Sequence, residues 1–110
     1  DILDFLVQDT QKYSLIIAAD VFGYIGCLEA LLGHIGRHLL ERGQLLFSIE
    51  LTNTADFVLQ STARYAHSNA YIQRLAAQVQ LTLLKSTEVT LRFQEQEPVP
   101  GKVFLLQKAH

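Results

Sequence analysis

Two unbroken apolar runs stand in the first half of the chain, at residues 15–19 and 45–47. A run without polar alternation is typical of a strand buried on both faces, as strands in parallel sheets are. Between the runs, apolar residues recur at helical spacing, which predicts a helix with one buried face ending near Gly43. Its apolar positions are Leu28, Leu31, Leu32, Ile35, Leu39 and Leu40. Strand, helix and strand form a βαβ unit, so we expect the two strands to be parallel.

The second half of the chain predicts another helix and a closing hairpin. The helix starts near Ser68, whose hydroxyl can cap exposed backbone N–H groups. Residues 87–93 alternate apolar and polar side chains as a half-buried strand does, and residues 103–106 form a final strand. Residues 98–101, Pro-Val-Pro-Gly, predict the tight turn between these two strands, which must then be antiparallel. The predicted order is β-α-β-α-β-β in one domain over residues 1–110.

Composition and charge narrow the classes of protein. Apolar residues make up 49% of the chain and charged residues 18%, which favours a packed core over disorder. The net charge of −2 provides no basic excess to hold a nucleic acid. No apolar stretch is long enough to span a bilayer, and no secretory signal is present. The single cysteine, Cys27, cannot form an internal disulfide, which is compatible with the cytoplasm.

Three segments of the chain, residues 13–26, 39–50 and 64–76, carry a resemblance to a known family. Residues 13–26 resemble the fourth strand, and the loop after it, of the class I S-adenosylmethionine-dependent methyltransferases. Residues 39–50 resemble the segment that leads into the fifth strand of these enzymes. Residues 64–76 are similar to a subgroup of predicted methyltransferases often fused to tetratricopeptide repeats. Gln80 and Cys27 depart from the pattern, because a glycine and an acidic residue are expected there. The resemblance implies an α/β fold: the C-terminal half of a Rossmann-like methyltransferase domain, with a mixed four-stranded sheet, two main helices and a closing antiparallel hairpin. The last strand is expected between the strands at residues 45–47 and 87–93.

The resemblance also implies S-adenosylmethionine as the cofactor. The glycine-rich loop and the acidic strand end that hold it in this family would precede Asp1. The chain begins at Asp1 and contains no methionine. We therefore expect an excised half-domain that binds the cofactor weakly and is inactive alone. The implied cofactor contacts within the chain are Asp1, Ala19, Asp20 and Val21.

Candidate residues for acceptor binding and catalysis lie at the strand ends, because ligands of open α/β sheets bind outside the carboxyl ends of the strands. Asp20 and Glu50 end the two parallel strands, and either could orient a methyl acceptor or take its proton. Residues 64–71 follow, with Arg64, Tyr65 and Tyr71 as acceptor-binding candidates and His67 as a candidate base. The structural alternative is that His67 helps to begin the helix while the tyrosines pack on the core.

The function predicted for the parent protein is methyl transfer to an unidentified small-molecule or protein acceptor. Two alternatives remain open: a non-catalytic binding module on the same fold, and a fragment of another nucleotide-binding α/β enzyme. His34 and His38 have a spacing that can bind zinc, but they lie on an ordinary polar helix face, and no metal is expected. The strand that contains Leu15 would be an unpaired edge, through which the chain is expected to self-associate.

Overall fold

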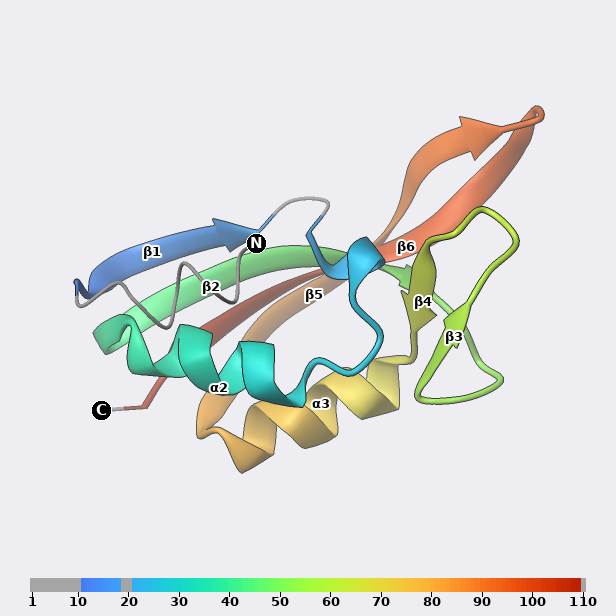
Figure 1. Cartoon of the computed structure of the whole chain (residues 1–110). Coiled ribbons are helices and arrows are strands. Elements are labelled where there is room, and N and C mark those ends of the chain that lie inside the picture. The colour runs from blue at the N-terminus through green and yellow to red at the C-terminus, as the bar shows by residue number, and fades with distance from the viewer. Residues whose placement is uncertain (1–10, 19–20, 110) are drawn as a thin grey trace.

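The computed structural model describes residues 11–18 and 21–109, which form one mixed sheet and two helices (Figure 1). Its strands are β1 (Tyr13–Ala18), β2 (Leu39–Leu51), β3 (Phe57–Leu59), β4 (Tyr65–His67), β5 (Leu81–Gln94) and β6 (Glu97–Lys108). Its helices are the short 3₁₀ turn η1 (Phe22–Tyr24) and the α-helices α2 (Glu29–Arg37) and α3 (Asn69–Gln78).

The strand pairing confirms the predicted core of the topology. β1 and β2 are parallel neighbours joined through α2, as expected of a βαβ unit. β6 lies between β2 and β5 and is antiparallel to both, which is the predicted position of the last strand. The N-cap of α3 is Ser68, whose hydroxyl accepts a 3.1 Å hydrogen bond from the backbone N–H of Tyr71.

The predicted number of four strands is wrong, because the sheet has six. The two additional strands, β3 and β4, have three residues each, too few to show an alternating pattern in the sequence. β4 runs parallel to the end of β2, with Glu50 opposite Ala66 and Leu51 opposite His67. β6 occupies the other edge of β2 at Glu50, so β4 continues the edge on which β1 lies.

The predicted end of the first helix is also wrong. α2 ends at Arg37, and Leu39 already belongs to β2. The Lys108 ammonium group donates to the carbonyl of Gly36 (2.9 Å), in the last turn of α2, and to the carbonyl of Leu39 (3.1 Å), at the start of β2, so it satisfies a carbonyl on each side of the junction. Gly43 lies inside β2, where a Cβ atom would come within 2.8 Å of the Leu40 carbonyl oxygen, so its role is close backbone approach.

The hairpin turn between β5 and β6 is at Glu95 and Gln96, not at residues 98–101. Both turn residues have positive φ (51° and 68°), the backbone geometry that matches the right-handed twist of a two-residue hairpin. Pro98 and Pro100 are inside β6, in the part that pairs only with β5, since pairing with β2 begins at Gly101. A proline is tolerated there because its missing N–H leaves no second neighbour unsatisfied.

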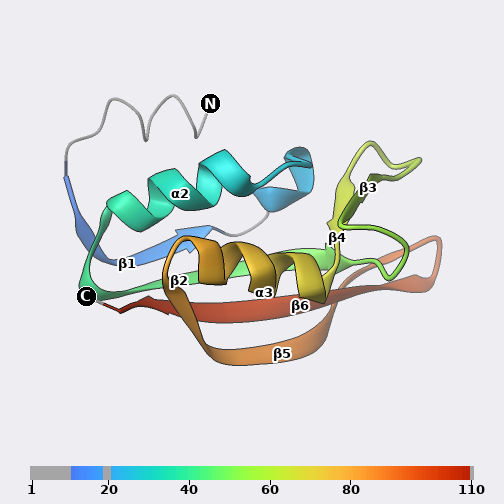
Figure 2. The same cartoon turned by 90° about the horizontal axis from the view of Figure 1, so that it is seen from below.

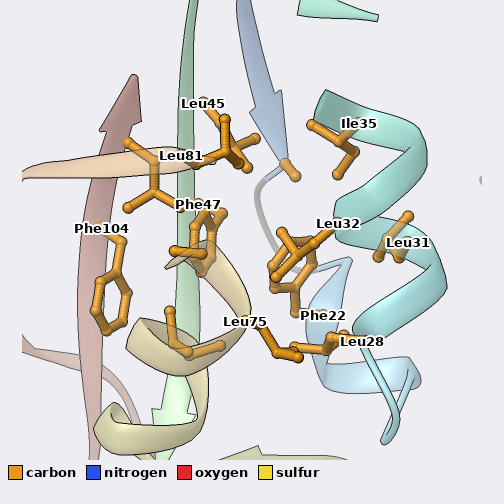
Figure 3. Packing of buried hydrophobic residues seen from close by; sticks show 14 of the residues in the cluster. Phe22, Leu28, Leu31, Leu32, Ile35, Leu45, Phe47, Leu75, Leu81 and Phe104 are labelled. Atoms are coloured by element: carbon orange, nitrogen blue, oxygen red, sulfur yellow. The ribbon is translucent and has the colours of Figure 1, made fainter. Parts of the chain in front are cut away.

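Both α-helices cover the same face of the sheet, and the core lies between the helices and that face (Figures 2 and 3). Three rings form its centre: the centroids of Phe22 and Phe47 are 4.5 Å apart, and those of Phe47 and Phe104 are 5.2 Å apart. The leucine and isoleucine side chains of α2 and α3 pack around these rings. On β1, Leu15 and Ile17 are 50% and 61% exposed, and within the described residues β1 pairs with β2 alone. Among the described residues β1 is therefore an edge strand, as predicted, whereas the prediction that this strand is buried on both faces is wrong at Leu15 and Ile17.

Candidate functional site

The loop between β1 and α2 packs against the segment from β3 to the start of α3, at the carboxyl end of β2. His67, the last residue of β4, directs Nε2 to the backbone carbonyls of Ile25 (2.8 Å) and Gly26 (3.2 Å). The phenolic oxygen of Tyr71 accepts a 3.0 Å hydrogen bond from the backbone N–H of Leu28. Three backbone groups of the loop region, at residues 25, 26 and 28, are thus held by two side chains more than 40 residues later in the sequence.

The His67 imidazole is completely buried. A carbonyl oxygen can only accept, so Nε2 carries the proton, and Nδ1 has the lone pair of the neutral tautomer. Nδ1 is buried and has no hydrogen-bond partner among the described residues. Burial lowers the pKa of His67, and the Ile25 and Gly26 carbonyls and the charge of Glu50 oppose this only in part. The neutral form of His67 is therefore favoured, and its Nε2–H group holds the loop through the Ile25 and Gly26 carbonyls. The catalytic role of His67 stays a prediction.

The two tyrosines of the predicted cluster also face the loop. Tyr71 is 5% exposed, and this burial raises the pKa of its hydroxyl group. The side chain of Cys27 raises the pKa further, whereas the hydrogen bond from the Leu28 N–H lowers it. Tyr65 packs across Gly26, where an added Cβ atom would lie 2.7 Å from the Tyr65 ring and 2.9 Å from the ring of Phe57. Gly26 is thus a close-packing position that sequence reasoning did not identify, and the only signal for it was a second glycine in the loop.

Glu50 ends the second parallel strand, as predicted, but both of its carboxylate oxygens have partners. Arg92 of β5 donates to Oε2 at 2.7 Å, in an ion pair where the Glu50 side chain is only 8% exposed. Gln60 donates to Oε1 at 2.9 Å and also to the backbone carbonyl of Arg64 at 3.2 Å. Glu50 therefore joins β2, β5 and the β3–β4 turn. Sequence reasoning missed Arg92 and Gln60, because nothing in the spacing pairs them with Glu50.

Arg64 is the arginine of the predicted cluster, and it is half-buried at the surface of this site. Its Cζ atom lies 5.3 Å from the centre of the Tyr24 ring, and Nη2 lies 3.4 Å from the Tyr24 hydroxyl. The Tyr24 side chain is 65% exposed. Beside them is a shallow depression lined by Gly23, Ser48, Ile49, Glu50, Arg64, Leu91 and Arg92. This depression lies at the carboxyl end of β2, where the predicted acceptor side is.

Most of the predicted cofactor contacts cannot be placed. Asp1, Ala19 and Asp20 lie outside the described residues. Val21 is half-buried and packs against the core. Ala18, at the carboxyl end of β1, is buried in the same core, so the described side chains on either side of residues 19–20 pack inward. Within residues 11–18 and 21–109, no three potential metal ligands come together, and no helix is long and apolar enough to cross a membrane.

The sequence matches no protein-family model and no curated protein. Several solved structures are similar to this chain, and most of the similar structures reported by name are methyltransferases. One from Methanosarcina mazei is 10% identical with a TM-score of 0.74, over 94% of this chain and 64% of that chain. The N-methyltransferase NodS of Bradyrhizobium japonicum, in complex with S-adenosyl-L-homocysteine, is 18% identical with a TM-score of 0.70, over 100% and 52%. TehB of Haemophilus influenzae is 13% identical with a TM-score of 0.75, over 98% and 39%.

The chain has the fold of the S-adenosylmethionine-dependent methyltransferases. It spans 39–64% of the length of these three structures. The antiparallel β6 between β2 and β5 agrees with the strand position that the family resemblance implied. Sequence identities of 10–18% establish the fold alone.

Proposed function

We propose that the protein transfers a methyl group from S-adenosylmethionine to an acceptor, and that this chain forms the acceptor side of the domain. The observation that carries the proposal is the structural match, which covers the whole chain in the comparison with NodS, a methyltransferase in complex with S-adenosyl-L-homocysteine. The clustering of residues 64–71 at the carboxyl end of β2 supports it, because that end of an open α/β sheet is where ligands bind.

The cofactor would supply a methyl group on a positively charged sulfur. The residues of this chain would align an acceptor lone pair with that methyl group, and such alignment would provide most of the acceleration. We propose that Val21, with Asp1, Ala19 and Asp20, contacts the cofactor, and that the segment from Arg64 to Tyr71 positions the acceptor.

Two roles are proposed for His67, and one experiment separates them. As a base, it would take the acceptor's proton through Nδ1, the ring nitrogen that has no partner. As a positioning residue, it would hold the Ile25–Gly26 backbone, which its present hydrogen bonds favour. Glu50 likewise could take a proton only after releasing Gln60 or Arg92.

The test uses the full-length protein and His67→Ala, with cofactor affinity, turnover and melting temperature measured on the same samples. Loss of a base lowers turnover, leaves cofactor affinity within a few-fold, and is partly compensated at high pH as the acceptor deprotonates unaided. Loss of a positioning contact lowers the melting temperature and produces a loss of turnover that pH does not restore. The wild-type control should bind S-adenosyl-L-homocysteine in calorimetry, and no heat at millimolar ligand would refute methyl transfer.

A non-catalytic binding module is the second candidate. The favouring observation is that both predicted catalytic side chains are engaged in internal hydrogen bonds. Calorimetry with S-adenosyl-L-homocysteine separates the candidates, because a module that lost the cofactor would bind none. A small-molecule or protein acceptor, fusion to tetratricopeptide repeats and a cytoplasmic location are parts of the first proposal.

A further inference from the structure

Two arginines of this chain lie over tyrosine rings, and they differ in charge pairing. Arg74 lies 5.4 Å from the Tyr71 ring centre and donates to the Asp56 carboxylate at 2.7 Å. Arg64 lies 5.3 Å from the Tyr24 ring centre and forms no ion pair with any residue of the described chain. The rings stabilise both cations, but among residues 11–18 and 21–109 only the charge of Arg74 has a partner of opposite sign.

The surroundings of Arg64 leave a positive charge in excess. Among the described residues that line the depression beside it, the charged side chains are Arg64, Arg92 and Glu50. Glu50 is already paired with Arg92 at 2.7 Å, which leaves the guanidinium of Arg64 unneutralised. An anion bound here would therefore meet one free cation and no free carboxylate among the described residues.

The backbone holds Arg64 in place. Its carbonyl oxygen accepts hydrogen bonds from the backbone N–H of Gln60 (3.0 Å) and from the Gln60 side chain (3.2 Å). The guanidinium group passes over Gly23, where an added Cβ atom would lie 3.8 Å from Nη1. A guanidinium group has five N–H donors in a planar fork, and within the described part of the chain the Arg64 guanidinium donates only to the Tyr24 hydroxyl. Paired donors therefore remain for a planar or tetrahedral oxyanion.

We propose that Arg64 and Tyr24 form a recognition site for an oxyanion, a carboxylate or a phosphate, carried by the methyl acceptor. The part that concerns the acceptor rests on the proposed function. Arg64 binds the oxyanion through its free N–H groups, and the exposed Tyr24 ring provides a flat apolar surface for the group that bears it. His67 and Tyr71, which are buried, hold the loop on which Tyr24 lies.

The test is a titration of the protein with three probes, in which the backbone amide NMR signals of Gly23, Tyr24 and Arg64 report binding. The probes are benzoate, inorganic phosphate and benzamide, the last as the neutral analogue of benzoate. At least one anion should produce saturable shifts that benzamide does not. Arg64→Gln should weaken anion binding about tenfold or more, since a charge-assisted bidentate contact is lost. Arg74→Gln, the matched arginine over a tyrosine, should leave the affinity within about twofold.

Each outcome decides one point. Stronger binding of benzoate supports a carboxylate-bearing acceptor, and stronger binding of phosphate supports a phosphorylated one. Arg64→Lys, which keeps the charge but not the fork, should bind with intermediate affinity. Absence of saturable shifts, equal shifts with benzamide, or unchanged affinity in Arg64→Gln would overturn the site. If the full-length protein binds anions here but not S-adenosyl-L-homocysteine, the methyl-transfer proposal fails and the anion site stands.

Discussion

Nε2 of His67 lies 2.8 Å from the carbonyl oxygen of Ile25, a residue 42 positions earlier in the chain. This hydrogen bond connects the end of β4 to the loop after β1, and Tyr71 adds a second connection at Leu28. The residue that the sequence predicts as a catalytic base therefore also holds the loop beside the proposed acceptor site. Because its Nδ1 atom is buried without a partner, protonation of His67 would place a charge in the interior.

The stability of the protein should therefore fall in mild acid. Burial lowers the folded-state pKa of His67 below the ordinary histidine value, so the unfolded chain binds a proton first as pH falls. The free energy of unfolding should be nearly constant above about pH 7 and decrease below about pH 6.5, with a limiting slope of about 1.4 kcal/mol per pH unit. Urea denaturation at several pH values measures it. His67→Gln, which keeps a donor but cannot titrate, should flatten this dependence.

The Glu50–Arg92 ion pair should contribute more to stability than the Asp56–Arg74 pair. Both have a 2.7 Å contact, but the Glu50 side chain is 8% exposed and that of Asp56 is 52% exposed. Glu50→Gln leaves the Arg92 charge without its partner in a partly buried site, and should cost about 2 kcal/mol. Asp56→Asn should cost less than about 1 kcal/mol, since solvent screens an exposed pair. Equal losses in urea denaturation would show that burial does not decide the strength of these pairs.

Two glycine-to-alanine changes should have opposite effects. Gly26→Ala places a Cβ atom 2.7 Å from the Tyr65 ring and should destabilise the protein by about 1–3 kcal/mol. Gly33→Ala lies inside α2, where the nearest atom to the new Cβ is a flexible Arg37 nitrogen at 3.7 Å. It should stabilise the protein by about 0.5–1 kcal/mol, because alanine favours a helix interior. Thermal melting of the two variants measures both effects, and stabilisation by Gly26→Ala would contradict the packing of the loop.

The β1 edge should mediate self-association. Residues 13–18 contain no charged residue or proline, the usual protections of an edge strand, and Ile17 is 61% exposed. Light scattering should show a mass that rises with concentration, and Ile17→Lys should reduce that rise. Phe93→Lys is the control, since Phe93 is 70% exposed near the β5–β6 turn, away from β1. A wild-type mass that stays monomeric across the concentration range would refute the association.

The sequence by itself determined the regular elements and the pairing of the long strands. Apolar runs at residues 15–19 and 45–47, with a helical stripe between them, were enough to predict parallel β1 and β2, because periodicity reports which faces are buried. Ser68 was identified as a helix cap because capping is a local interaction. The position of β6 followed from the family resemblance, and the structure confirms it.

Only the tertiary structure decided the state of the candidate site. Glu50 and Arg92 are 42 residues apart, as are Ile25 and His67, so no local pattern could pair them. Burial of His67 depends on how the β1–α2 loop packs on β4, and the unpaired charge of Arg64 depends on where Asp56 and Glu50 find their partners. The same holds for β3 and β4, whose three residues each become strands through hydrogen bonds to one another and to the end of β2. A hydrogen bond or ion pair between distant segments forms only after the elements pack together, and its residues carry no trace of it in their spacing.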